Sequence, residues 1–379
     1  MNYFRQDSII STNVNYSYNV FIKDLHKLTS LYPFISVGSI GKSIMGKDIP
    51  FIKIGNGSNE VFYSASYHAN EWITSIVLMK FLADYCYCYS NNLTIFGYPA
   101  RWLFNVSTIY LVPMVNPDGV DLVTGTLPTS SPSYTQASKI AYGFATIPFP
   151  NGWKANIEGI DLNLQFPAEW EMARSNKFSQ GYTKPGPRDY VGPSPLYAPE
   201  ARALYNFTLS KRFSLILAYH SQGEVIYWQF QNYNPPYSFE IGTQFANVSG
   251  YSLESTPYNS SFAGYKDWFI QNYNLPGYTI ETGLGENPLP ISQFQDIYNK
   301  NIGISKCEAA AERALSINKN ANISIIYKFI TEDNFNDLLV NKYDYVIDAC
   351  DDVNAKLLLI EYAGKENISL ISSMGTGKR

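Results

Sequence analysis

The 379-residue sequence predicts an α/β fold with a largely parallel or mixed sheet. Two observations carry this prediction: short apolar runs typical of strands alternate with helical patterns, and no internal repeat of solenoid or propeller length is found. With 45% hydrophobic residues, the chain is long enough to bury one large core and something smaller. We therefore expect a large domain over residues 1–317 and a partial α/β fragment over residues 318–379.

The elements follow from apolar patterns along the chain. The clearest strands are expected at 61–67, 107–115, 213–220 and 277–281, and helices at 71–85, 198–211 and 299–317. The first of these helices is apolar almost all round, so it should be packed on most faces. Residues 123–195, rich in Ser, Pro, Tyr and Gly, are too long for an ordinary connection and are predicted to be a functional loop region.

Composition excludes several classes of protein. The net charge of -4 comes from interspersed acids and bases, which argues against a nucleic-acid partner. No run of eighteen apolar residues occurs, so we expect no membrane insertion. The start lacks the pattern of a signal peptide, which predicts a cytoplasmic protein, with a location outside the cytoplasm as the alternative. The four cysteines do not resemble a disulfide framework and are expected to be buried thiols.

Polar side chains stand at the ends of three predicted strands. His68 follows the run 61–67, while His220 and Glu281 stand at the ends of two later runs. Because ligands bind beyond the carboxyl ends of the strands in open α/β sheets, we expect these side chains to converge.

His68 and Glu71 span the corner between a strand and a helix, where an offset of three can aim both at one ion. A hydrolytic zinc ion needs three protein ligands and one open position for water. The sequence therefore predicts one Zn²⁺ held by His68, Glu71 and His220, with Glu281 as the base. Each residue alone is a weak signal, and a histidine that is merely hydrogen-bonded at a strand end is the alternative for each position.

Read together, five ordered segments resemble the zinc carboxypeptidase family over about residues 15–315. They are His68-Ala69-Asn70-Glu71-Trp72, Asn116-Pro117-Asp118-Gly119, Gly159-Ile160-Asp161-Leu162-Asn163, His220-Ser221 and Tyr278-Thr279-Ile280-Glu281. The resemblance implies the same three zinc ligands and Glu281 as general base and acid. It also implies an α/β/α sandwich around a mixed sheet, which strand alternation alone does not establish.

One departure bears on the substrate. In the exopeptidases of this family an arginine follows the Asp-x-Asn motif and clamps the terminal carboxylate, whereas here Leu164 follows Asn163. Leucine offers no hydrogen-bond donor, so the anchor for ordinary C-terminal residues is lost. The run 161–167 instead resembles the subgroup that cleaves γ-D-glutamyl to diamino acid bonds in bacterial peptidoglycan peptides, and Asn163 is then expected to bind substrate.

Further roles rest on the same resemblance. Lys154 aligns with the arginine that stabilises the oxyanion, and a solvated loop lysine is the alternative. Lys266 falls where the family has its substrate-pocket residue, and it could pair with a diaminopimelate carboxylate or lie on the surface. Tyr258 is the expected mobile tyrosine that caps the substrate, with Tyr265 as its rival and aromatic packing as the alternative. His26 lies in a polar helical stretch and is expected on the surface.

The tail has a different pattern, with strands expected at 343–350 and 368–374 around a helix at 353–367. It resembles the ubiquitin-activating-like adenylating enzymes, most closely the tRNA threonylcarbamoyladenosine dehydratase branch. That resemblance would place Asp348 or Asp351 near a nucleotide and metal. The glycine-rich turn that brings backbone amides to the phosphates has no counterpart, so we expect no adenylation.

The sequence thus predicts a zinc metallopeptidase that hydrolyses peptidoglycan-derived peptides, with the γ-D-glutamyl to diaminopimelate bond as its target. Two alternatives remain: a metallocarboxypeptidase on ordinary peptides, and a non-catalytic module that binds muropeptides. The four intact residues His68, Glu71, His220 and Glu281 argue against the second, because a degenerate site would be expected to have lost at least one of them.

Overall fold

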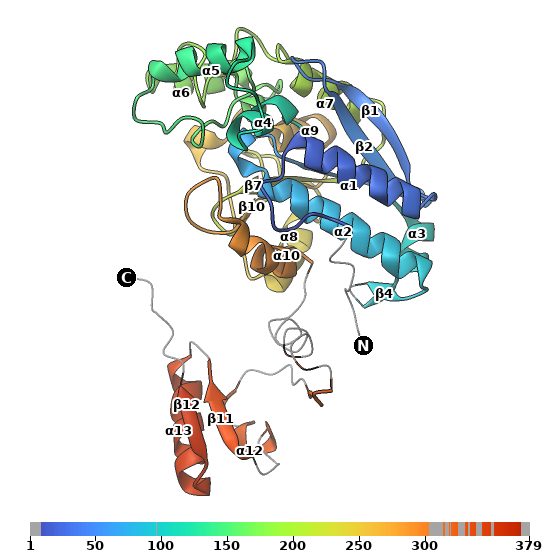
Figure 1. Cartoon of the computed structure of the whole chain (residues 1–379), viewed down its shortest axis with the longest axis vertical. Helices are drawn as coiled ribbons and strands as arrows, with labels where there is room; N and C mark the ends of the chain where they lie inside the picture. Colours follow the sequence, from blue (N-terminus) through green and yellow to red (C-terminus); the bar gives the residue numbers. More distant parts are fainter. Residues whose placement is uncertain are drawn as a thin grey trace. The chain divides into compact units, whose positions relative to one another are not determined.

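The computed structural model describes residues 9–95 and 97–302, and in the tail residues 314, 318, 320–324, 330–332, 334–338, 343–349 and 352–372. The chain divides into a large unit, Met1–Ser305, and a small unit, Lys306–Arg379 (Figure 1). The boundary expected after residue 317, and most of the helix expected at 299–317, lie outside the described residues.

The large unit is built on a mixed eight-stranded sheet with the order β1-β2-β6-β3-β7-β10-β8-β9. Its strands are β1 (Ser36–Lys42), β2 (Asp48–Gly55), β3 (Asn59–Ala65), β6 (Ser107–Val112), β7 (Leu215–Ser221), β8 (Val225–Tyr227), β9 (Ser252–Glu254) and β10 (Gly277–Thr282). The central strands β6, β3, β7 and β10 run parallel. These are the four strands that the apolar runs predicted, because parallel strands buried on both faces are continuously apolar.

The outer strands were not predicted from the apolar runs. The β1–β2 hairpin is antiparallel and joins the sheet through β6, and β8 pairs antiparallel with β10. In β1, with the sequence SVGSIGK, every residue is at least partly exposed. An edge strand of this kind carries no continuous apolar run, so its place in the sheet depends on pairing with β2.

Alternate residues of the central strands enter two separate hydrophobic cores, one on each face of the sheet. In β6, Ile109 and Leu111 belong to one core, and Tyr110 and Val112 to the other. This alternation follows from the two-residue period of a strand. It establishes the α/β/α sandwich, since both faces must be covered by other elements.

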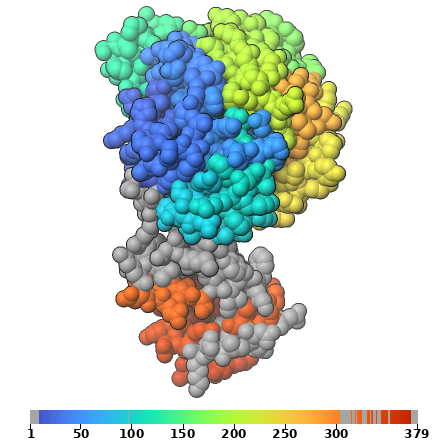
Figure 2. Space-filling model, turned by 90° about the vertical axis from the view of Figure 1, so that its right-hand side faces the viewer, coloured from blue at the N-terminus to red at the C-terminus, as the bar shows by residue number. Residues whose placement is uncertain are grey.

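The helices divide between these two cores. The first core is covered by α1 (Tyr18–Leu31), α2 (Ile73–Ser90), α3 (Ala100–Val106), α8 (Ser238–Ser249) and α10 (Phe294–Asn301). The second is covered by α6 (Trp170–Ser179), α7 (Pro199–Leu209) and α9 (Tyr265–Tyr273). Helices α1 and α2 lie side by side on one face (Figure 1), and α7 packs against β1, so that distant segments share one surface (Figure 2).

Helix α2 is buried nearly all round, as its sequence predicted. It contacts β3, α1, α3 and α10, and fourteen of its eighteen residues are buried. In the described residues no helix is both long and apolar enough to cross a membrane.

The stretch 123–195 is less irregular than predicted. It contains α5 (Pro132–Tyr142), the short turn η2 (Leu162–Leu164) and α6. Prolines begin and interrupt its segments, and Ser131 caps α5 by accepting a hydrogen bond from the backbone of Tyr134. The remaining residues form the irregular segment from which several site residues come.

Two further short elements of the large unit precede this stretch. They are α4 (Pro117–Val123) and the hairpin of β4 (Thr94–Ile95) with β5 (Tyr98–Pro99).

The small unit has the predicted strand-helix-strand order. Strands β11 (Tyr345–Asp348) and β12 (Ser369–Ser372) pair in parallel and are joined through α13 (Val353–Glu366). A further short helix, α12 (Phe335–Leu338), packs on them through Phe335. The buried core of this small unit is itself small.

Candidate metal centre

Four of the predicted site residues lie at the carboxyl ends of the central parallel strands. Strand β3 ends at Ala65, and the chain then passes through His68 into a single 3-10 turn, η1 (Ala69–Glu71). Strand β7 carries His220, whose partner in the parallel pairing with β10 is Glu281. Because directly paired residues project from the same face of a sheet, His220 and Glu281 point to the same side.

His68, Glu71 and His220 converge on one point. The Nδ1 atom of His68 lies 2.9 Å from Oε1 of Glu71, and the Nδ1 atom of His220 lies 2.9 Å from Oε2 of the same carboxylate. The two Nδ1 atoms are 3.2 Å apart. All three side chains are buried, and one ligand atom from each lies within 4.8 Å of the others.

This donor set fits a zinc ion. Bonds of about 2.0–2.2 Å from nitrogen and oxygen to one tetrahedral centre place neighbouring ligand atoms about 3.3 Å apart. The separations between His68, Glu71 and His220 are close to that value. In addition, two imidazole nitrogens that face each other at 3.2 Å cannot both be protonated without repulsion, whereas a shared cation satisfies both lone pairs.

Charge within the cluster keeps the carboxylate of Glu71 ionised. Burial would raise the pKa of Glu71, but His68 and Lys154 outweigh it and hold that pKa well below its usual range. Burial opposes the charged form of His68 as well, yet Glu71 raises its pKa to about 9. Burial keeps the pKa of His220 below its usual value. The carboxylate is therefore ionised, as a metal ligand must be.

Asp161 orients His68, a role that the sequence did not assign to it. Its Oδ1 atom lies 3.1 Å from Nε2 of His68 and accepts the backbone N–H of Asn163 at 3.1 Å. Its Oδ2 atom accepts the backbone N–H of Asp189 at 3.2 Å. A carboxylate that holds the proton on Nε2 leaves Nδ1 free to bind a metal. The Asp161-Leu162-Asn163 segment was recognised in the sequence, but the contact of Asp161 with His68 could be identified only from the fold.

Asn287 also supports the cluster, and no sequence signal identified it. Its Nδ2 group lies 3.4 Å from Oε1 of Glu71 and donates to the carbonyl of Ser221 at 2.6 Å. The hydroxyl of Ser221 donates to Oδ1 of Asn287 at 2.8 Å. The turn after β10 is thereby joined to the end of β7 beside the carboxylate.

Lys154 lies at the cluster, where it could support an oxyanion. Its Nζ atom is 3.4 Å from Oε1 of Glu71, and one fifth of its side chain is exposed. Its carbonyl accepts the N–H of Ala69 at 2.9 Å, which fixes the turn that carries Glu71. Burial opposes the charge, but Glu71 and further carboxylates raise the pKa of Lys154 above its usual value. It is therefore a fixed cation beside the predicted metal.

Glu281 combines burial with nearby charge. Burial, together with repulsion from Glu71, raises the pKa of its carboxyl to about 8, whereas Lys154 and His68 lower it. Part of its side chain is accessible. A carboxyl with a pKa near neutrality can accept a proton and return it, as a general base and acid must do.

The two candidate capping tyrosines differ in exposure. Tyr258 is 64% exposed in the short turn η3 (Tyr258–Ser260) and packs edge-on against Phe262. Tyr265 is fully buried, and its hydroxyl lies 2.8 Å from that of Thr208. A residue that closes over a substrate has to be free to move, so the geometry favours Tyr258 over Tyr265.

Asn163 and Leu164 occupy different environments. The Oδ1 atom of Asn163 accepts the N–H of Tyr265 at 3.1 Å, and its Nδ2 group has no hydrogen-bond partner in the described part of the chain. Leu164 is 9% exposed and belongs to the second core with Phe166. The amide of Asn163 is therefore available to a ligand, whereas Leu164 is committed to packing.

Lys266 is held by protein atoms. Its Nζ atom donates to the carbonyl of Gln229 at 2.6 Å and to the hydroxyl of Thr256 at 3.2 Å, and it lies 2.6 Å from Oδ1 of Asp267. An ammonium group has three protons, so these contacts use all of them. The side chain is 4% exposed, and this geometry does not support the predicted contact between Lys266 and a substrate carboxylate.

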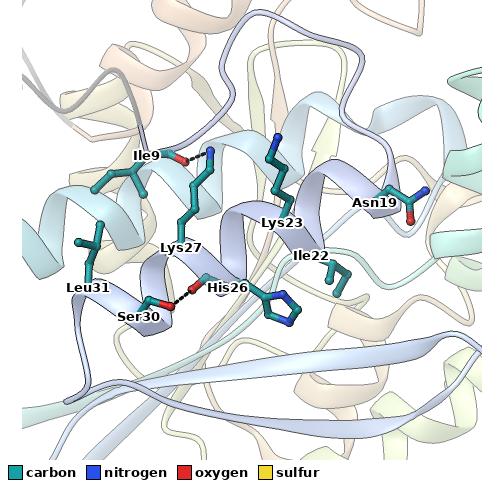
Figure 3. Close-up of a pocket in the computed structure, with 8 residues that line it drawn as sticks. All are labelled: Ile9, Asn19, Ile22, Lys23, His26, Lys27, Ser30 and Leu31. Atoms are coloured by element: carbon teal, nitrogen blue, oxygen red, sulfur yellow. Dashed lines mark hydrogen bonds between the residues drawn. The ribbon is translucent and has the colours of Figure 1, made fainter.

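A shallow depression on the outer side of α1 lies apart from this cluster (Figure 3). His26 is exposed there, as expected, and its carbonyl accepts the hydroxyl of Ser30 at 2.8 Å. The ammonium of Lys27 donates to the carbonyl of Ile9 at 3.2 Å and to Asp24 at 3.1 Å. The described residues that line this depression include no Asp or Glu, so they do not resemble the donor set of the metal centre.

In the small unit, Asp348 is buried and engaged by its neighbours. Its Oδ2 atom accepts hydrogen bonds from Lys356 at 2.8 Å and from the hydroxyl of Ser372 at 2.6 Å. Asp351, the other residue expected near a nucleotide, lies outside the described residues.

A mixed sheet whose central parallel strands present a His-Glu-His set defines the class, a zinc peptidase of the carboxypeptidase type. The zinc carboxypeptidase family model matches residues 21–303, and this chain belongs to that family of zinc metallopeptidases. It is 46% identical over 299 residues to gamma-D-glutamyl-L-diamino acid endopeptidase 1 of Lysinibacillus sphaericus, an alignment that covers 78% of this chain and 72% of that protein.

Solved structures support the fold. Thrombin activatable fibrinolysis inhibitor superposes with a TM-score of 0.60 at 18% identity, covering 84% of this chain and 77% of that one. At this level of identity the likeness concerns the fold alone.

The tail matches other proteins. The ThiF family model matches residues 293–379. The chain is also 38% identical over 77 residues to the tRNA threonylcarbamoyladenosine dehydratase of Escherichia coli, an alignment that covers 20% of this chain and 29% of that protein. The similarity thus spans less than a third of the length of that relative.

Proposed function

We propose that this protein hydrolyses the γ-D-glutamyl to diamino acid bond in peptidoglycan-derived peptides. The observation that carries the proposal is the 46% identity over 299 residues to an endopeptidase named for that bond. The burial of Leu164, where the exopeptidases of this family carry an arginine, adds support. A substrate with extra carboxylates also suits a centre flanked by the fixed cation of Lys154.

In the proposed reaction His68, Glu71 and His220 hold one zinc ion. When bound there, zinc polarises the scissile carbonyl and lowers the pKa of a water ligand. Asp161 keeps the proton of His68 on Nε2, so that Nδ1 faces the metal.

The other groups move protons and bind charge. Glu281 takes a proton from the attacking water and delivers it to the leaving amine. Lys154 stabilises the negative charge that develops on the carbonyl oxygen, because a preorganised cation costs no reorganisation during the reaction. Asn163 offers its Nδ2 group to the substrate, and Tyr258 closes over it. Lys266 is left out of this scheme because its protons already bind protein atoms.

The test is hydrolysis of L-alanyl-γ-D-glutamyl-diaminopimelate, followed by mass spectrometry of the released diaminopimelate. We expect release that stops with a zinc chelator and returns when zinc is restored. Equal release with and without chelator, or none in the presence of zinc, would contradict the proposal.

The two alternatives are separated by the same assay. A carboxypeptidase on ordinary peptides would cleave an α-linked peptide with a free end and spare the matching amide. A non-catalytic binding module would bind the tripeptide without cleaving it. The predicted cytoplasmic location stays a prediction, which cell fractionation tests.

We further propose that residues 1–317 form the peptidase domain and residues 318–379 a fragment that does not adenylate. The engagement of Asp348 by Lys356 and Ser372 supports the second point. Titration of the whole protein with Mg²⁺-ATP tests it, and saturable binding would contradict it.

A further inference from the structure

Arg188 lies in a short segment that is attached to the metal centre on both sides. The carbonyl of Pro187, the preceding residue, accepts the backbone N–H of Lys154 at 2.7 Å and that of Ala155 at 2.9 Å. The backbone N–H of Asp189, the following residue, donates to Asp161 at 3.2 Å. Arg188 therefore emerges between the predicted oxyanion cation and the carboxylate that orients a zinc ligand.

The guanidinium of Arg188 is held at one edge. Its Nε atom donates to Oδ2 of Asp189 at 2.6 Å, while the other oxygen of that carboxylate lies 2.5 Å from Nζ of Lys177, which is buried. Asp189 has a φ of 64°, a left-handed conformation that is uncommon outside glycine. A cost in backbone energy at such a position is typical of functional sites. The pair of Asp189 and Lys177 thus fixes the direction of Arg188.

The opposite edge of the guanidinium is available. Within the described residues no hydrogen bond from Nη1 or Nη2 of Arg188 is found, and 43% of its side chain is exposed. Arg188 is also close enough to the centre to interact electrostatically with Lys154 and Asp161. Two parallel N–H groups on a fixed plane match the two oxygens of a carboxylate.

We propose that Arg188 is a substrate-binding residue that takes a carboxylate of the γ-D-glutamyl-diamino acid substrate by a bidentate contact. This rests on the proposed function and names the group that recognises the acidic substrate. In this proposal Arg188, which comes from a different loop, replaces the arginine that the exopeptidases of the family carry at the position of Leu164. Asp189 and Lys177 are positioning residues that act through Arg188.

Two carboxylates of the substrate have the required chemistry, the α-carboxylate of D-glutamate and a carboxylate of diaminopimelate. The experiment compares three substrates: the parent tripeptide, its D-glutamate α-amide, and the analogue with lysine in place of diaminopimelate. Each is cleaved by the wild type and by the R188Q and R174Q variants. Arg174 is a matched control because it is similarly exposed, at 47%, and lies on α6 beside Glu171.

For R188Q we expect kcat/KM on the parent substrate to fall roughly 10- to 100-fold, the range for hydrogen bonds to charged groups. The kcat/KM of R188Q should hardly fall for the one analogue that lacks the bound carboxylate, and that analogue identifies which carboxylate Arg188 binds. R174Q should match the wild type on all three. Zinc content and thermal midpoint, measured for each variant, show whether the centre and the fold are intact.

Two results would overturn the inference while leaving the proposed function standing: R188Q equal to wild type on the parent substrate, or an equal loss on all three substrates. Failure of the wild type to release diaminopimelate would instead overturn the proposed function. The D189N variant tests positioning, because asparagine tolerates the same φ. It should raise KM for the parent substrate more than it lowers kcat, and it should leave the selected analogue unaffected.

Discussion

Replacement of Asp161 by asparagine tests the geometry of the metal centre directly. The carboxylate receives His68 Nε2 and the N–H of Asn163 on one oxygen, and the N–H of Asp189 on the other. An asparagine of the same shape must turn its NH₂ group towards one of these donors. If its oxygen stays with His68, the N–H of Asp189 loses its acceptor, and in either orientation the charge that holds the imidazole proton is gone.

The expected effect is a loss of zinc affinity of about 10- to 100-fold, the range for groups that orient a metal-bound histidine. This corresponds to about 1.4–2.7 kcal/mol. The unpaired N–H should also lower the free energy of unfolding by about 1–3 kcal/mol.

Competition with a chromogenic chelator at fixed pH measures the affinity, and urea unfolding of the metal-free protein measures the stability. The D48N variant is a control, because it also removes one carboxylate charge. Asp48 is 56% exposed and pairs with Lys42, and neither residue contacts a predicted zinc ligand in the described structure. If folded D161N binds zinc within about twofold of the wild type, the orienting role of Asp161 is wrong.

Three further predictions concern the base, a buried carboxyl and the tyrosines. E281Q should reduce kcat at least 100-fold, the lower end for a lost general base, and still bind zinc, whereas E286Q at an exposed position should keep full activity in the same assay. Burial raises the pKa of Glu200 to about 7 from a usual 4.5, so its ionisation opposes folding: the free energy of unfolding should decline by about 3 kcal/mol as pH rises from about 4.5 to 7. Urea unfolding across this range should show the decline in the wild type and much less of it in E200Q; equal slopes would contradict it. Y258F should change kcat/KM without a change in thermal midpoint, whereas Y265F, which loses a buried hydrogen bond to Thr208, should lower stability by about 1 kcal/mol.

The strands that are apolar in sequence were predictable because burial on both faces requires continuous apolar runs. β3, β6, β7 and β10 are such strands. β1 was not, since its residues alternate between glycine, serine and partly exposed aliphatic groups, and its pairing with β2 provides the stabilisation that its composition lacks. The helices inside 123–195 were missed for a related reason, because α5 and α6 bury few apolar residues, and α5 begins at a cap that Ser131 provides.

The sequence by itself determined the chemistry of the centre, since it shows two histidines and a glutamate at strand ends and the three-residue offset of His68 and Glu71. The fold decided which distant groups complete it. Asp161 and Asn287 reach the centre through loops whose course depends on the packing of the whole sheet. It also decided that Lys266 is satisfied internally, because the direction of a side chain follows from its neighbours in space, and neighbours in space are fixed by tertiary packing.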